Sequence, residues 1–111
     1  MILQDFLPSV LKQTAYIQVA GGNDKFDRYD KWSVENHNGE LLFLIDPSEP
    51  FEWEPNYWAS EYAEFDFHGG DEVTISSDGK TAELEDLDFS KWKVGFYRSD
   101  GSVIDLNHSV V

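Results

Sequence analysis

Cysteine is absent from this sequence, and basic residues and long apolar runs are scarce. Without cysteine, disulfide frameworks, thiolate zinc sites and cysteine nucleophiles are excluded. No apolar run approaches the roughly 20 residues that a membrane-spanning helix needs. The first residues lack the basic region and the long apolar region of a secretory signal peptide. We therefore expect a cytoplasmic protein that does not associate with a membrane.

Lysine and arginine together number eight, against 22 aspartates and glutamates, which gives a net charge of −14 over 111 residues. Binding to nucleic acid needs a basic footprint that neutralises phosphates, so direct binding to DNA or RNA is disfavoured. Disordered acidic chains are poor in aromatic residues, whereas 15% of this chain is aromatic and 41% is hydrophobic. We therefore predict a single acidic globular domain over residues 1–111.

The negative charge is concentrated in the middle of the chain. Residues 46–90 hold fourteen acidic residues and a single basic one, Lys80, and no lysine or arginine lies between Lys31 and Lys80. Such density of one sign costs stability through self-repulsion. It is typical either of a solvated face or of a surface complementary to a basic partner, and the strong asymmetry favours the partner.

Hydrophobic spacing predicts the secondary structure. Apolar residues recur at helical intervals over 2–13, which indicates an amphipathic helix with Asp5 as its N-cap and Pro8 in its first turn. The residues at 23–31 are predicted to form a polar loop. Alternating or continuous apolar residues predict strands over 16–20, 32–35, 39–46, 64–68, 72–76, 81–85, 92–98 and 102–106.

The turns and prolines complete the predicted architecture. Asn38-Gly39 and two Ser-Asp-Gly sequences, at 77–79 and 99–101, predict hairpins. The apolar run at 41–45 predicts a central strand. Proline is favoured at the first position of a helix, so Pro55 is compatible with one further short helix around 55–63. The predicted fold class is α+β, with an N-terminal helix packed on a mainly antiparallel β-sheet.

Signals for catalysis are weak. The histidines, at positions 37, 68 and 108, lie in predicted turns or near the C-terminus, and no G-x-S-x-G nucleophile elbow is present. The glycine pairs lack the lysine of a phosphate-binding loop. We expect no catalytic residues, no cofactor and no enzymatic activity.

Two clusters carry metal-ligand residue types. The candidate for a transition metal is His68, Asp71 and Glu72, and the candidate for calcium is Asp24, Asp27 and Asp30. A turn alone rarely supplies the convergent ligands of a transition-metal site, and the aspartates lack the glycine and terminal glutamate of an EF-hand loop. We therefore expect no metal requirement.

Residues 49–67 combine seven aromatic side chains with six acidic ones. Aromatic rings offer cation–π contacts and apolar area, and carboxylates offer charge-assisted hydrogen bonds to lysine and arginine. At least half of the rings are expected in the core, whereas residues 51–54, between two prolines, are predicted to form an exposed loop. The predicted partner-binding residues of this segment are Glu49, Phe51, Glu52, Trp53, Glu54, Tyr57, Glu61, Glu64 and Asp66.

A second acidic stretch contains Glu83, Glu85, Asp86 and Asp88. Alternate residues of a strand project together about 6.6 Å apart, so Glu83 and Glu85 are predicted to share a face, with Leu84 opposite. A change of parity after Asp86 indicates that the strand ends there. Carboxylates at this spacing resemble a row of phosphates, so all four acidic residues are predicted to bind the partner.

These features predict a non-enzymatic acidic inhibitor that binds a basic nucleic-acid-handling protein such as a nuclease, in part as a DNA or RNA mimic. Over the ~35 Å width of such a domain, one side of duplex DNA shows on the order of ten phosphates, which mid-chain acids can match. Anti-restriction and anti-CRISPR proteins of phages act in this way as a class; the analogy rests on size and charge.

Two other functions remain open. One is an immunity protein that neutralises a cationic toxin. The other is a small ligand-binding module that uses Trp53 and Trp58 as a stacking platform. Salt separates the last alternative from the first two, because stacking of a neutral ligand depends little on ionic strength.

Overall fold

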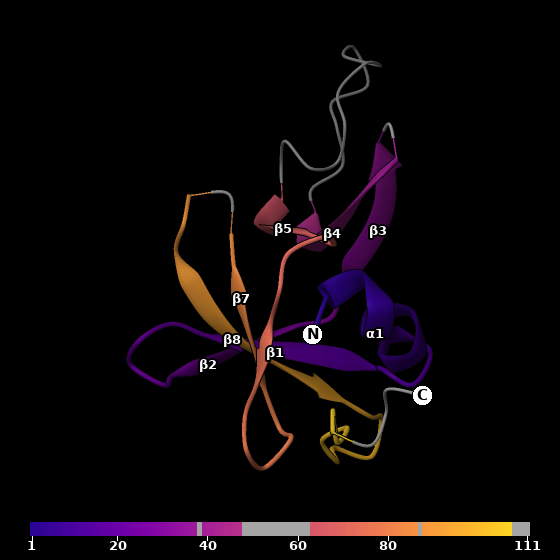
Figure 1. Cartoon of the computed structure of the whole chain (residues 1–111). Coiled ribbons are helices and arrows are strands. Elements are labelled where there is room, and N and C mark those ends of the chain that lie inside the picture. Colours follow the sequence, from indigo (N-terminus) through magenta and orange to yellow (C-terminus); the bar gives the residue numbers. More distant parts are fainter. Residues whose placement is uncertain (38, 48–62, 87, 108–111) are drawn as a thin grey trace.

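The computed structural model describes residues 1–37, 39–47, 63–86 and 88–107 (Figure 1). Within these ranges the chain forms a helix followed by strands. The elements are α1 (Leu3–Leu11), β1 (Tyr16–Ala20), β2 (Phe26–Tyr29), β3 (Trp32–His37), β4 (Glu40–Pro47), β5 (Ala63–His68), β6 (Thr74–Ile75), β7 (Ala82–Glu85) and β8 (Lys91–Tyr97).

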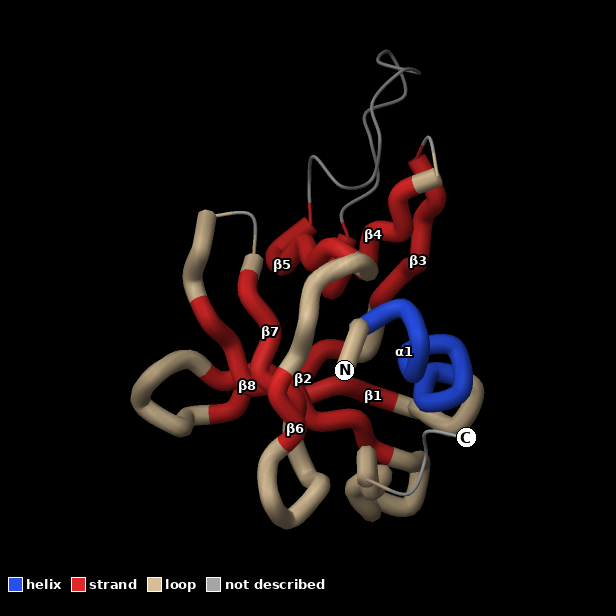
Figure 2. Tube along the Cα trace, in the orientation of Figure 1, coloured by secondary structure: helices blue, strands red, loops and turns tan. Residues whose placement is uncertain are grey.

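The strands divide between two antiparallel sheets (Figure 2). One sheet has five strands in the order β2-β1-β8-β7-β6, and the other has three in the order β3-β4-β5. The predicted α+β class with mainly antiparallel pairing is confirmed. The division into two sheets was not predicted, because alternation within a strand does not say which strand it pairs with.

Helix α1 begins earlier than its sequence predicts. Its N-cap is Ile2, whose side chain makes no capping bond, so the prediction of Asp5 as the N-cap is wrong. The first backbone amides are capped by tertiary contacts instead: the Leu3 and Gln4 N–H groups donate to the carbonyls of Asp71 (3.1 Å) and Gly69 (2.8 Å). Pro8 consequently lies inside the helix rather than in its first turn.

The core joins the helix to both sheets. Leu3, Phe6, Leu7 and Val10 of α1 are fully buried, as their helical spacing predicts, and they belong to the same hydrophobic cluster as the inner residues of the strands. Phe43 of β4 connects the sheets, because its ring centroid lies 6.2 Å from Phe67 of β5 and 6.3 Å from Phe96 of β8. Packed rings at these separations contribute both apolar burial and favourable ring geometry.

Most strand predictions are confirmed. β1 has the predicted bounds. β4 is the central strand of its sheet, and its residues at 42–45, which include Leu42 and Leu44, are buried on both faces of the strand. β7 ends at Glu85, as the change of parity predicts. The further short helix was predicted around 55–63. Residues 55–62 lie outside the described ranges, and Ala63 is the first residue of β5.

Two strand predictions are wrong. Residues 23–31 are not only a loop, since β2 pairs with β1 from Ala20↔Phe26 to Ile17↔Tyr29. β2 is an edge strand with three exposed residues, so its sequence lacks the apolar alternation that identifies buried strands. Residues 102–106 form only an isolated bridge, Tyr97↔Val103, rather than a strand.

No helix in the described part of the chain is long and apolar enough to cross a membrane.

Candidate partner-binding surface

The predicted acid–aromatic segment lies largely beyond the described ranges. Its predicted partner-binding residues there are Glu49, Phe51, Glu52, Trp53, Glu54, Tyr57 and Glu61. The strands on either side are described: Pro47 at the end of β4 pairs with Ala63 at the start of β5. The described residues on either side of the segment therefore lie together, at the end of the β4–β5 pair.

The remaining two residues of that segment, Glu64 and Asp66, lie on β5. The strand alternates as predicted: Phe65 and Phe67 are buried, Glu64 is exposed and Asp66 is half-buried. Asp66 lies directly across from Leu44 of β4. Glu64 is thus available to a partner close to the place where residue 63 re-enters the sheet.

Carboxylates from three strands gather around the phenol of Tyr29. The pKa of Tyr29 is raised above its ordinary value, first by burial and then by the negative charges of Glu64 (β5), Asp27 (β2) and Asp46 (β4). Asp27 and Tyr29 share one face of β2, because alternate residues of a strand point the same way. We call these four residues the Tyr29 cluster.

The Tyr29 cluster rests on packed rings. The Tyr29 ring meets Phe65 edge-on, with centroids 5.4 Å apart and an interplanar angle of 86°. Phe65 in turn meets Trp92 of β8 at 4.8 Å and 67°. This row of rings joins the two sheets and packs the Tyr29 ring against the core.

The arginine of β2 is occupied elsewhere. Arg28, which follows Asp27, points to the opposite face of β2. There its guanidinium lies 4.0 Å from the centroid of the Tyr16 ring and 2.9 Å from the carboxylate of Asp30. The ion pairs found within the described ranges include none of the three carboxylates of the Tyr29 cluster.

The second predicted acidic stretch has a different environment. Glu83 and Glu85 project from one face of β7 with Leu84 buried opposite, as predicted. Across the sheet, however, Glu83 pairs with Lys93 and Glu85 with Lys91. The Lys91 Nζ lies 3.9 Å from Glu83 Oε1. This β7–β8 face therefore carries both signs of charge rather than a row of carboxylates alone.

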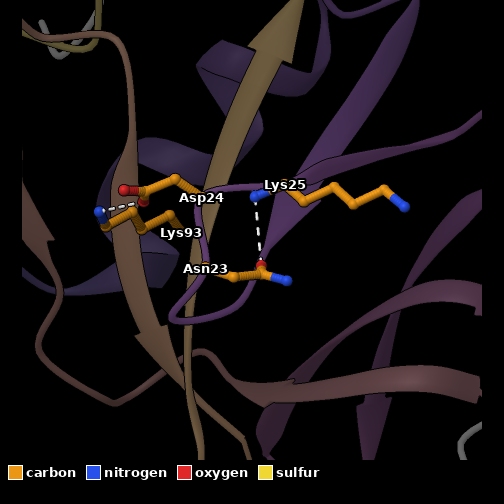
Figure 3. A network of polar contacts seen from close by, with 4 residues as sticks. All are labelled: Asn23, Asp24, Lys25 and Lys93. Carbon is orange, nitrogen blue, oxygen red and sulfur yellow. Dashed lines mark hydrogen bonds and ion pairs between the residues drawn. The ribbon is translucent and has the colours of Figure 1, made fainter.

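Lys93 is also held by the β1–β2 turn. Its ammonium donates to the carboxylate of Asp24 at 2.6 Å, next to a turn in which the Asn23 side chain accepts from the Lys25 N–H at 3.2 Å (Figure 3). The hydrogen bond to Asp24, followed by the charges of Asp24 and Glu83, raises the pKa of Lys93. The ammonium is thereby fixed in its charged form beside Glu83.

Asp86 supports its own turn. Its Oδ1 accepts hydrogen bonds from the backbone N–H groups of Asp88 and Ser90, both at 2.9 Å, and its Oδ2 accepts from the Trp92 indole at 2.7 Å. Three donors from the protein already use this carboxylate. Asp88, by contrast, has an exposed side chain on the same turn.

The two candidate metal clusters are not assembled in the structure. His68 pairs through Nδ1 with Glu40 rather than with Asp71 or Glu72. Of the three aspartates, Asp24 is bound to Lys93 and Asp30 to Arg28. Within the ranges that the structure describes, no three His, Asp or Glu side chains form a group able to hold a metal ion.

The His68–Glu40 pair borders an open polar depression of about 680 Å³, also lined by Gln4, Leu41 and Asp71. Both side chains of the pair are partly exposed, at 32% and 55%. The pair ties β5 to the start of β4 and lies beside the backbone groups that cap α1. Its position is thus explained by the fold.

Sequence reasoning assigned only Glu64 of the Tyr29 cluster to the partner-binding surface and considered Asp27 only as a calcium ligand. Tyr29 itself was assigned to a polar loop, and Asp46 was taken only as the end of a strand. Asp46 has a left-handed backbone (φ 55°), and its N–H donates to the Lys31 carbonyl at 2.8 Å. The sequence of β2, Phe-Asp-Arg-Tyr, does not alternate, so it offered no local signal of a strand.

No protein-family model, no curated protein and no solved structure matches this chain.

Proposed function

We propose that this chain is a non-enzymatic acidic inhibitor that binds a basic nucleic-acid-handling protein, with carboxylates occupying positions that phosphates of DNA or RNA otherwise take. The observation that carries the proposal is the Tyr29 cluster. Three carboxylates from separate strands act on one phenol that packs on aromatic rings, and gathered like charges are unfavourable for folding alone. A surface that retains such repulsion is suited to a cationic partner.

The position of the Tyr29 cluster supports the same function. Asp46 directly precedes Pro47 in the sequence, and Glu64 directly follows Ala63. Pro47 and Ala63 pair with each other, and most of the acid–aromatic segment lies between them in the sequence. The cluster is therefore adjacent along the chain to four further glutamates, Glu49, Glu52, Glu54 and Glu61, which make this stretch of the sequence rich in negative charge. Long-range attraction from such a surface accelerates association with a basic partner.

The experiment measures binding to a panel of purified basic nucleases and DNA-binding proteins at low and high ionic strength. We expect tight binding to at least one of them, competition by duplex DNA, and affinity that falls steeply with salt. The chain itself should not bind DNA. A panel on which nothing binds, or binding indifferent to salt and to competing DNA, contradicts the proposal.

A matched pair of variants locates the surface. Asp46→Asn combined with Glu64→Gln removes two charges from the Tyr29 cluster and should weaken binding by about tenfold or more. Asp5→Asn combined with Glu72→Gln removes the same charge from exposed positions elsewhere and should have a much smaller effect. Equal effects of the two pairs would show that net charge, rather than the Tyr29 cluster, drives binding.

A further inference from the structure

Phe89 combines two unusual properties. Its side chain is 82% exposed, the highest value among the exposed large hydrophobic residues of the described ranges. Its backbone has φ 65°, in the left-handed region that bulky side chains rarely adopt. Burial gains nothing from this residue, and its backbone conformation is strained.

The same chain contains a matched turn that shows what the backbone requires. In residues 98–102, Gly101 N–H donates to the Arg98 carbonyl (3.0 Å) and Arg98 N–H donates to Ser102 (2.8 Å). In residues 86–90, Phe89 N–H donates to the Asp86 carbonyl (3.1 Å) and Asp86 N–H donates to Ser90 (2.9 Å). The two turns share this pair of hydrogen bonds, and in each the residue that donates to the first carbonyl, Phe89 or Gly101, has a left-handed backbone.

Phe89 therefore occupies the position that glycine occupies in the matched turn. Gly101 has φ 87°, and glycine adopts this region at no steric cost. Gly79 of the other Ser-Asp-Gly turn, with φ 75°, follows the same pattern. Folding alone favours glycine at position 89, so the phenylalanine calls for a reason outside the fold.

The turn also holds Phe89 in place. The Asp86 carboxylate accepts hydrogen bonds from Asp88, Ser90 and Trp92, and the Trp92 ring packs against the buried Phe65. The ring is thus presented to solvent beside a set of hydrogen bonds that is already formed. Such pre-organisation reduces the conformational entropy that is lost on binding.

We propose that Phe89 is an apolar anchor that inserts into an apolar pocket, rimmed by basic groups, on the partner protein. The inference rests on the proposed function and deepens it by assigning the residue that enters the partner. Charge complementarity identifies the rim, because the exposed Asp88 directly precedes Phe89 and the chain has a net charge of −14. A second copy of this chain is a poor occupant, since two molecules of charge −14 repel each other.

The test uses the panel protein that the wild-type chain binds and three variants. Phe89→Gly removes the ring and relaxes the backbone, so it should raise the melting temperature by on the order of 5 °C and weaken binding by about 30-fold or more. Phe89→Ala removes the ring but keeps the left-handed strain, so it should weaken binding equally without that stabilisation. The slope of affinity against salt should stay as in the wild type, because no charge is removed.

Gly101→Ala is the matched control. A Cβ at Gly101 would have the Tyr16 hydroxyl at 3.8 Å as its nearest neighbour, an ordinary contact, so the variant reports the left-handed strain alone. It should lower the melting temperature and leave affinity unchanged.

The outcomes separate the two proposals. If the wild-type chain binds no panel protein, the proposed function fails, and the anchor fails with it. If the wild-type chain binds and Phe89→Gly binds equally well, the anchor alone fails. A wild-type dimer in sedimentation that Phe89→Gly dissociates would identify a second copy as the occupant and would also overturn the anchor.

Discussion

The Tyr29 cluster and the β7–β8 face are both acidic in sequence, but they differ in what lies opposite. At the Tyr29 cluster, burial and then the negative charges of Glu64, Asp27 and Asp46 raise the pKa of the phenol. On the β7–β8 face, Glu83 and Glu85 meet Lys93 and Lys91 across the sheet. One region concentrates negative charge, and the other balances it.

This difference shows that strand pairing, and not a run of acidic residues alone, determines whether a region concentrates negative charge or balances it. Opposite charges directly across a sheet stabilise it modestly, whereas gathered like charges destabilise it. The stretch at 83–88 has as high an acid density as any part of the chain, yet its residues play three roles. Glu83 and Glu85 pair with lysines, Asp86 supports a turn, and Asp88 is exposed.

The largest expected effect tests which acidic residue of the stretch at 83–88 stabilises the fold and which one is available to a partner. Asp86→Ala removes an acceptor used by two backbone amides and the Trp92 indole, so it should lower the free energy of unfolding by about 2 kcal/mol. Asp88→Ala, the control on the same turn, should change it by less than about 0.5 kcal/mol. Urea denaturation of both variants measures this, and equal stabilities would show that the carboxylate of Asp86 does not hold the turn.

A smaller effect on the free energy of unfolding, with opposite signs at the Tyr29 cluster and on the β7–β8 face, tests whether the two regions differ in their balance of charge. Asp46→Asn with Glu64→Gln relieves repulsion and should raise the free energy of unfolding by about 0.5 kcal/mol. Asparagine suits position 46 because, like aspartate, it tolerates the left-handed backbone found there. Glu83→Gln with Glu85→Gln removes cross-strand pairing and should lower the free energy of unfolding by a similar amount, about 0.5 kcal/mol.

Both double variants change the net charge equally, so each serves as the control for the other. Urea denaturation at low salt gives the two signs, and added salt should shrink both differences. The same sign for the two pairs would mean that whole-chain charge outweighs local pairing.

The sequence is sufficient for those parts of the fold that repeat an apolar pattern. α1, β1, β4, β5, β7 and β8 have inner faces that alternate or run continuously, and all were placed within a few residues. The start of α1 was misplaced because its cap is the backbone of residues 69 and 71, which no local pattern encodes. β2 was missed because an exposed edge strand needs no apolar face.

The candidate surface was only partly predictable for the same reason. Glu64 and the alternation of Glu83 and Glu85 follow from strand parity alone. The meeting of Asp27, Asp46 and Glu64 at Tyr29 depends on three separate strands, and the lysines opposite Glu83 and Glu85 depend on the β7–β8 register. Phe89 stood out only once its φ angle could be compared with that of Gly101.

The smallest expected effect separates the two causes that raise tyrosine pKa values. Burial is the main cause for both Tyr29 and Tyr97, but the next cause for Tyr29 is the charge of three carboxylates, and for Tyr97 it is the neighbouring Tyr16. The rings of Tyr16 and Tyr97 stack with centroids 5.1 Å apart. Salt screens charge but not burial, so added salt should lower the pKa of Tyr29 more than that of Tyr97.

Tyrosine side-chain NMR shifts followed from neutral to alkaline pH give both pKa values in one titration. Glu64→Gln should lower the pKa of Tyr29 and leave Tyr97 unchanged. Because each phenol binds its proton more tightly in the folded than in the unfolded chain, its contribution to stability is complete below the ordinary pKa of 10.0 and is lost as pH rises through the folded value. Equal responses of Tyr29 and Tyr97 to salt and to Glu64→Gln would mean that the carboxylates do not act on Tyr29. The Tyr29 cluster would then not concentrate negative charge, and its contrast with the β7–β8 face would be wrong.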